Sequence, residues 1–122
     1  MDRFAVNEMP GNGVSLRGQL VQHEPIRTSP TGVPVLECTI WHEAEVVEAA
    51  AARRLAFACP ARALGPVAQR LSLESPEQWL LIKGFVAPRR GAFSTKDAMN
   101  GRFTPGLIFH ITEYELEKDH GI

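Results

Sequence analysis

The segment LLIKGFVAPRRGAFSTKDAMNGRFTPGLIFHI, residues 80–111, places a basic stretch between two apolar runs. The runs at 80–86 and 107–111 have the apolar character of β-strands. The dipeptide Asn100-Gly101 favours a tight turn because both residues tolerate positive φ. The segment therefore predicts a long β-hairpin.

Positive charge is concentrated in residues 83–103, which hold five cations and one acid, a net of +4. The chain of 122 residues has a formal net charge of −1, so everything outside this stretch sums to −5. Cations neutralise phosphates and aromatic rings stack on bases, so a basic hairpin with interleaved phenylalanines suits a flexible polyanion. An ordinary solvated loop is the alternative. The candidate contacts in this region are Lys83, Arg89, Arg90, Phe93, Lys96, Arg102 and Phe103.

Composition narrows the classes of protein that fit. With 44% hydrophobic and 22% charged residues, the chain has the make-up of one globular domain. No apolar run approaches the ~20 residues of a membrane span and no signal peptide opens the chain, so we expect a cytoplasmic protein without a membrane partner. Cys38 and Cys59 fall in apolar patterns and are expected to be reduced core residues.

Neither a metal site nor an active site is indicated. The four histidines are scattered, and no Cys-x-x-Cys pair is present. The sequence also lacks a glycine-rich phosphate loop, clustered carboxylates and a Cys/His or Ser/His pair placed by a motif. We therefore expect no catalytic residue, no cofactor and no small-molecule substrate.

Alternating apolar residues predict five short strands. They lie in residues 14–21, 35–42, 55–59, 79–86 and 107–116, and Pro60 is expected to end the third. The last strand changes phase between Ile111 and Tyr114, which is typical of a β-bulge. Residues 43–52, EAEVVEAAAA, have helix-forming composition but lie between two strands, and we interpret them as a loop. Residues 61–73 suggest a short helix limited by Gly65-Pro66 and reaching about Arg70.

Five short strands, with a helix between the third and fourth, predict an all-β fold, a closed Greek-key barrel with a long hairpin joining its last two strands. Gly18 and Gly84 lie where strands of a small barrel bend. We expect residues 1–12 to be a flexible extension, 13–118 the barrel domain and 119–122 a short tail.

This order of strands and helix resembles the OB-fold. Leu-x-Gly at 16–18, PIRTSPTGVP at 25–34, LECTIWHEAE at 36–45 and IKGFV at 82–86 together resemble the primosomal replication protein N (PriB) family, related to bacterial single-stranded DNA-binding protein. The resemblance covers about residues 13–118. It implies a homodimer that binds single-stranded DNA non-specifically and assists the primosomal helicase in replication restart.

The resemblance also implies site residues. Phe57 stands at the aromatic position of the third strand, where the family has tryptophan, and Arg89 and Arg90 stand near the basic loop positions. This chain differs in its smaller ring, its longer loop between the last two strands, and its arginines in place of lysines. Arginine both stacks and pairs with phosphate, so the last two differences favour binding.

Several residues fit two roles. Arg53 and Arg54 either flank the same groove as Phe57 or form a plain surface pair. Trp41 either lies in the dimer interface or stacks on a base. Phe93 and Phe103 either stack on bases or pack the two sides of the hairpin together.

Two other functions are compatible with the sequence. A protein-interaction adaptor of the primosome with weak DNA binding fits the near-neutral charge. A short general single-stranded DNA-binding protein fits the fold. General coating proteins continue into a glycine-rich linker and an acidic tail, which EKDHGI at the end of this sequence lacks, and so we expect the primosomal relative.

Overall fold

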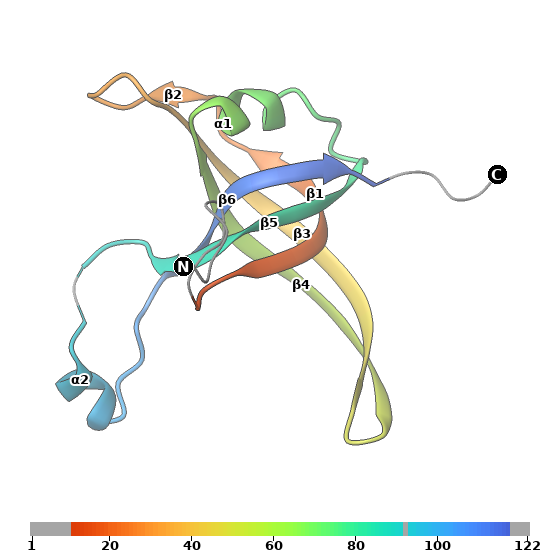
Figure 1. Cartoon of the computed structure of the whole chain (residues 1–122), viewed down its shortest axis with the longest axis vertical. Coiled ribbons are helices and arrows are strands. Elements are labelled where there is room, and N and C mark those ends of the chain that lie inside the picture. The colour runs from red at the N-terminus through yellow and green to blue at the C-terminus, as the bar shows by residue number, and fades with distance from the viewer. Residues whose placement is uncertain (1–10, 92, 118–122) are drawn as a thin grey trace, which may run out of the picture.

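Five long strands wrap into a closed barrel in the computed structural model, which describes residues 11–91 and 93–117 (Figure 1). In chain order the elements are β1 (Val14–His23), β2 (Arg27–Thr28), β3 (Pro34–Glu48), β4 (Ala51–Leu64), α1 (Pro66–Leu71), β5 (Trp79–Pro88), α2 (Thr95–Met99) and β6 (Leu107–Leu116). The sheet runs β1-β5-β6-β4-β3 and closes because β3 also pairs with β1. All neighbours are antiparallel except β4 and β6, which pair in parallel. The predicted all-β barrel is confirmed.

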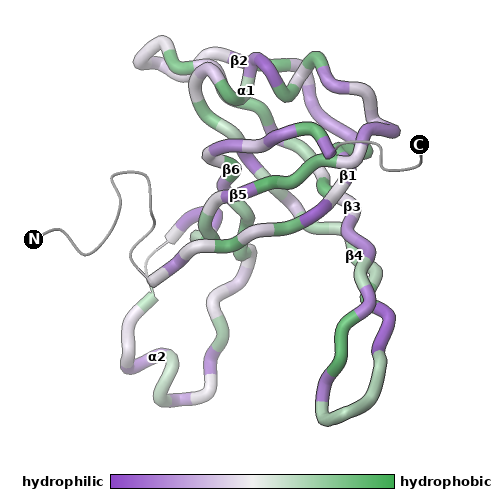
Figure 2. Tube along the Cα trace, turned by 45° about the vertical axis from the view of Figure 1, so that its right-hand side comes forward, coloured by the Kyte–Doolittle hydropathy of each residue, from purple (hydrophilic) through white to green (hydrophobic). Residues whose placement is uncertain are grey.

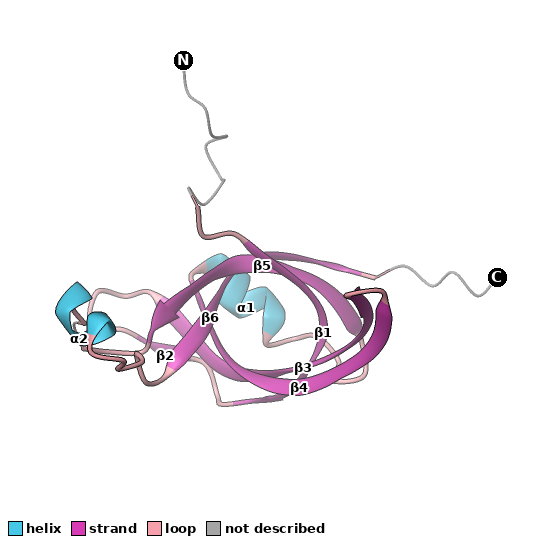
Figure 3. Ribbon diagram, turned by 90° about the horizontal axis from the view of Figure 1, so that it is seen from below, coloured by secondary structure: helices cyan, strands magenta, loops and turns pink. Residues whose placement is uncertain are grey.

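The core is built from the alternating rows that the sequence predicts. Leu36 and Ile40 of β3 and Leu80 and Ile82 of β5 are fully buried. Helix α1 lies across one opening of the barrel, where the end view shows it inside the ring of strands (Figure 3). It buries Val67, Ala68 and Leu71 against the strands, so the helix predicted between the third and fourth barrel strands closes the core.

A bulge in β6 accounts for the predicted phase change. Lys83 pairs with Glu113 and Gly84 with Ile111, so Thr112 is an extra residue on β6. At Gly84 the strands approach so closely that a Cβ atom would overlap the carbonyl oxygen of His110. The bulge and the glycine together let β5 and β6 bend around the barrel.

Three predictions of local structure are wrong: the loop at 43–52, the junction of the third strand with the helix, and the turn at Asn100-Gly101. Residues 43–52 are not a loop: β3 and β4 continue in register as far as the pair Glu48–Ala51, and only Ala49 and Ala50 form the turn. Pro60 does not end the third barrel strand, which continues to Leu64, so residues 61–64 are not helical and α1 begins at Pro66.

The third error concerns the basic segment. Asn100-Gly101 does not form a hairpin turn, because Asn100 has φ −90° and follows the last turn of α2. Strands β5 and β6 separate after the pair Pro88–Leu107, and the described residues of the segment 89–106 (all but Ala92) project as an arm that carries α2.

The predicted extension and tail are mostly outside the described residues, and those domain boundaries stay predictions. Asn12, at the predicted boundary, is anchored: its side-chain amide donates to the Val86 carbonyl at 2.8 Å and its side-chain oxygen accepts from the Val86 N–H at 3.1 Å. No helix in the described part of the chain is long and apolar enough to cross a bilayer.

Candidate nucleic-acid interface

Two projections leave the same end of the barrel: the arm of residues 89–106 and the distal part of the β3–β4 hairpin (Figures 1 and 2). The predicted site residues are divided among these projections and the barrel wall. In OB-folds the outer face of the second and third barrel strands, with the loops that join strands one to two and four to five, binds oligonucleotides. Here those parts are β3, β4, residues 24–33 and the arm.

The arm is held at its base and at its helix. The N–H of Arg89 donates to the carbonyl of Gly106 at 2.8 Å. Ser94 caps α2: its hydroxyl accepts from the N–H of Asp97, and the Asp97 carboxylate accepts from the N–H of Ser94 at 3.2 Å. Hydrogen bonds from the N–H and hydroxyl of Ser94, then from Arg102, lower the pKa of Asp97.

Both predicted phenylalanines of the arm are exposed to solvent. Phe93 is 42% exposed and Phe103 is 89% exposed. Phe103 therefore does not pack the two sides of the arm together, and its ring is accessible to a base. Met99, at the end of α2, adds a further exposed apolar side chain.

Some of the predicted cations are ion-paired in the structure and others are not. Arg53 pairs with Glu48 at 2.6 Å and Arg54 with Glu43 at 3.3 Å, both within the β3–β4 hairpin. Arg102 pairs with Asp97 at 3.0 Å and Arg89 lies 3.7 Å from Glu37. Among the described residues, Lys83, Arg90 and Lys96 have no ion-pair partner.

Phe57 lies on the face of β4 that continues the barrel interior, not on the outer face. It is paired across the ladder with His42, and the two ring centroids are 5.0 Å apart with an angle of 42° between the planes. Phe57 is 40% exposed as a residue, and the His42 ring covers part of its side chain. Its outer-face neighbours on β4 are Ala56 and Ala58, which offer no stacking surface. The stacking role of Phe57 stays a prediction.

Trp41 faces outward from β3, as predicted, and is half-buried. Its indole N–H donates to the carboxylate of Glu43 at 2.8 Å. One edge of the ring is thereby fixed in place on the barrel wall. Its assignment to a dimer interface stays a prediction.

A cluster of charged residues on the outer face was not predicted. Glu37 of β3 accepts from Arg62 of β4 at 2.7 Å and from Arg27 of β2 at 3.1 Å, and Arg89 approaches from the base of the arm. We call these four residues the Glu37 cluster. Burial pushes the pKa of Glu37 upward, but Arg62, Arg27 and Arg89 outweigh it and hold this pKa below its usual range. The cluster joins the loop before β3, the two central strands and the arm.

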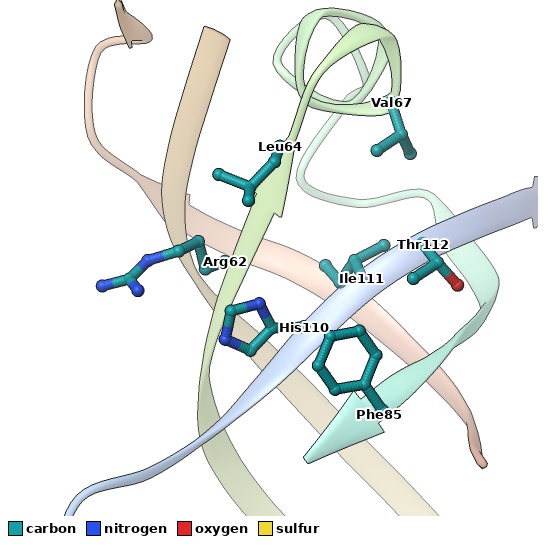
Figure 4. A pocket seen from close by; sticks show the side chains of 7 residues that line it. All are labelled: Arg62, Leu64, Val67, Phe85, His110, Ile111 and Thr112. Atoms are coloured by element: carbon teal, nitrogen blue, oxygen red, sulfur yellow. The ribbon is translucent and has the colours of Figure 1, made fainter. Parts of the chain in front are cut away.

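A pocket of about 210 Å³ lies beside Arg62 (Figure 4). Most of its lining side chains are apolar, and among them Phe85 of β5 is stacked on His110 of β6, with centroids 4.9 Å apart and 10° between the planes. Burial, and then the nearby Arg62, lower the pKa of His110. The residues that line the pocket are Arg62, Leu64, Val67, Phe85, His110, Ile111 and Thr112.

This arrangement has the properties of a surface for a charged, aromatic polymer. The arm supplies cations and exposed rings, the Glu37 cluster supplies guanidinium groups, and the pocket presents a ring pair beside Arg62. The sequence could not reveal the cluster or the pocket, because their members lie far apart in the chain and Arg62 was assigned to a helix. Within the described residues no group of three or more His, Cys, Asp or Glu is placed to hold a metal ion.

Comparison with known proteins gives the family. Residues 12–113 match a family model described as another single-strand binding protein family. A curated relative, replication restart protein PriB from Bordetella pertussis, is 35% identical over 79 residues, which cover 65% of this chain and 74% of the relative.

Solved structures agree with this result. The structure of PriB from Ralstonia solanacearum has 29% identity and a TM-score of 0.71, and the match covers 88% of this chain and 98% of that one. The single-stranded DNA-binding protein from Thermus aquaticus shares the fold, with 18% identity and a TM-score of 0.65 over 90% of this chain and 52% of that chain. The chain belongs to this single-strand binding protein family, as a relative of replication restart protein PriB.

Proposed function

We propose that this protein binds single-stranded DNA without strong sequence preference, as a cytoplasmic, homodimeric accessory of replication restart that assists the primosomal helicase. The observation that carries the proposal is the arm: residues 89–106 contain four cations and one acid, a net of +3, on a chain whose net charge is −1. The arm also exposes Phe93 and Phe103 beside these cations.

The mechanism follows from the two kinds of group on this surface. Backbone phosphates would lie along Arg90, Lys96 and the guanidinium groups at the base of the arm, while bases would stack on exposed rings of the arm and on the ring pair that lines the pocket. Stacking on phenyl rings is tolerant of sequence because every base has a π-face. Phosphate contacts carry no sequence information.

A titration of fluorescent oligo-dT at several salt concentrations tests the proposal. Four phosphate contacts predict a slope of log K against log salt of about −3, since each contact to a single strand contributes ~0.7. Oligomers of mixed sequence should bind within a few-fold of oligo-dT, and a duplex of equal length should bind more weakly. A slope near zero, or no binding, would contradict the proposal.

One observation favours a second function, a protein-interaction adaptor. Arg53, Arg54, Arg89 and Arg102 are already ion-paired, which reduces the charge available for phosphates. An adaptor would bind the helicase with the same affinity whether or not an oligonucleotide is present. A DNA-binding accessory would bind oligo-dT alone, which the titration measures directly.

A further inference from the structure

The Glu37 cluster holds more positive charge than its one carboxylate neutralises. Three arginines surround Glu37, which leaves an excess of +2 at one place on the outer face. They come from β2, from β4 and from the residue that follows β5, so the chain brings them together only in the folded barrel. Such an excess attracts a second anion.

Among the described residues, most of the guanidinium donors in the cluster have no hydrogen-bond acceptor. A guanidinium has five N–H groups. Within the described chain, the side chains of Arg27 and Arg62 each donate one hydrogen bond, both to Glu37, and Arg89 lies at 3.7 Å, beyond hydrogen-bond distance. The remaining donors are therefore available to an oxyanion of tetrahedral shape.

The three arginines differ in how firmly they are held. The Arg62 side chain is 21% exposed and its Nε lies 2.7 Å from Glu37, its direct partner across the ladder. The Arg27 and Arg89 side chains are 57% and 39% exposed. Arg27 and Arg89 can therefore turn from Glu37 to an incoming anion, while Arg62 keeps Glu37 in place.

We propose that Arg27, Arg62 and Arg89 form a seat for one backbone phosphate of a single strand, and that Glu37 competes with this phosphate as a resident anion. The inference rests on the proposed function, because the phosphate is part of the DNA that the arm binds. A carboxylate and a phosphate use the same guanidinium donors, so Glu37 limits the affinity of the site. Glu37 also keeps the three arginines assembled when no DNA is bound.

The base attached to this phosphate would lie at the pocket next to the Glu37 cluster. Arg62 borders both the Glu37 cluster and the pocket, and the stacked Phe85 and His110 rings lie on the pocket side of it. A phosphate at the cluster would therefore place its base near the ring pair. One nucleotide unit would occupy cluster and pocket together.

The test compares Glu37→Gln with wild type and with Glu77→Gln. Glu37→Gln removes the charge but keeps an oxygen that can accept from Arg62. Glu77→Gln makes the same change in net charge in the turn before β5, at the opposite end of that strand from Arg89. Anisotropy of oligo-dT should show about three- to tenfold tighter binding for Glu37→Gln at 50 mM salt and less than a twofold change for Glu77→Gln.

Two further features distinguish competition from a structural role. The gain should shrink at 500 mM salt, because the Debye length falls well below 10 Å. The gain in oligo-dT affinity from Glu37→Gln should also be smaller in an Arg89→Gln background. There the change in log K should be less than half the change seen in the wild-type background. If Glu37 serves only to hold the arm and the loop together, Glu37→Gln will bind oligo-dT equally or more weakly than wild type, and the inference is overturned.

A second probe separates this inference from the proposed function. Inorganic pyrophosphate is added while the side-chain Nε–Hε NMR signals of Arg62 and Arg89 are followed. We expect these signals to shift and saturate in both proteins, at a lower pyrophosphate concentration in Glu37→Gln than in wild type. This result would support the anion site even if wild type binds no oligo-dT. Absence of these shifts in both proteins, with normal oligo-dT binding, overturns the seat and leaves DNA binding by the arm standing.

Discussion

The β3–β4 hairpin and the arm leave the same end of the barrel (Figure 2), but their net charges have opposite signs. The hairpin is a continuous ladder whose residues 43–54 contain two arginines and three glutamates, a net of −1. The arm has a net of +3 over residues 89–106. We therefore expect a phosphate to be attracted to the arm and repelled by the hairpin, although both carry adjacent arginines.

The difference shows that a pair of arginines in a sequence does not by itself mark a nucleic-acid contact. Arg53 and Arg54 are neutralised by glutamates from the facing strand. Arg90 and Lys96 project from a segment with one acid, Asp97, which is used to cap α2 and to bind Arg102. Local pairing decides which cations are available.

The largest expected effect compares the two arginine pairs directly. Arg89→Ala with Arg90→Ala should weaken oligo-dT binding by about ten- to a hundredfold at 50 mM salt and flatten the salt slope by about one to two, because two phosphate contacts are lost. Arg53→Ala with Arg54→Ala removes the same charge from the hairpin. The oligo-dT affinity of this hairpin variant should fall less than threefold.

Both double variants should keep the melting temperature of the wild type within a few degrees, since exposed ion pairs contribute little to stability. Equal losses in the two variants would show that the hairpin also binds the strand. An arm variant that binds like wild type would remove the arm from the interface.

The barrel was predictable because apolar and polar residues alternate along its strands. Leu36, Cys38 and Ile40 are buried on one side of β3. The phase change between Ile111 and Tyr114 indicated a bulge, which the structure places at Thr112. Such patterns are local in the sequence and follow directly from the two-residue period of a strand.

The projections were less predictable because tertiary pairing overrides local preference. EAEVVEAAAA has the composition of a helix, but its partner strand supplies cross-strand contacts such as Glu43 with Arg54. Pro60 is tolerated inside β4 because β6 pairs only from Ala61 onward, so β4 has an open edge at the proline.

Helix α2 did have a sequence signal. Ser94-Thr95-Lys96-Asp97 matches a capping box, which indicates the start of a helix and outweighs the turn preference of Asn100-Gly101. The Glu37 cluster had no such signal. Arg27, Glu37, Arg62 and Arg89 come from four segments and are brought together only in the folded barrel.

The second-largest expected effect is on stability, and it comes from the turn of the β3–β4 hairpin. Ala49 and Ala50 have φ of 52° and 64°, a left-handed conformation that costs an alanine about 1–2 kcal/mol. Ala49→Asn with Ala50→Gly should raise the free energy of unfolding by about 1 kcal/mol, after the greater flexibility of glycine in the unfolded chain is subtracted. Urea denaturation measures this as a higher midpoint at unchanged slope.

The control introduces the same Asn-Gly dipeptide one position later in the chain. Ala50→Asn with Ala51→Gly places glycine in β4, where it should remove most of the gain. DNA affinity should not change in either variant. A fall in stability for the Ala49→Asn, Ala50→Gly variant would contradict the left-handed turn.

The smallest effect is confined to the arm. Ser94→Ala removes the hydroxyl that accepts from the N–H of Asp97 at 3.2 Å, and it should destabilise α2 locally by about 1 kcal/mol. Amide hydrogen exchange of residues 96–100 should accelerate several-fold, while the melting temperature of the barrel stays unchanged, since α2 buries no residue in the core. Thr95→Ala, which deletes a neighbouring hydroxyl outside the cap, should leave exchange nearly unaffected.

Acid should have the same effect as removing the cap. The pKa of Asp97 is lowered in the folded arm, so its stabilisation is fully present above the ordinary value of 3.8 and is lost as the pH falls through the lower, folded-state pKa. The protection of α2 amides should fall in that window in wild type and remain low and flat in Asp97→Asn. Unchanged protection in wild type would mean that α2 is held by something other than its cap. The arm would then share the rigidity of the hairpin and differ from it in charge alone.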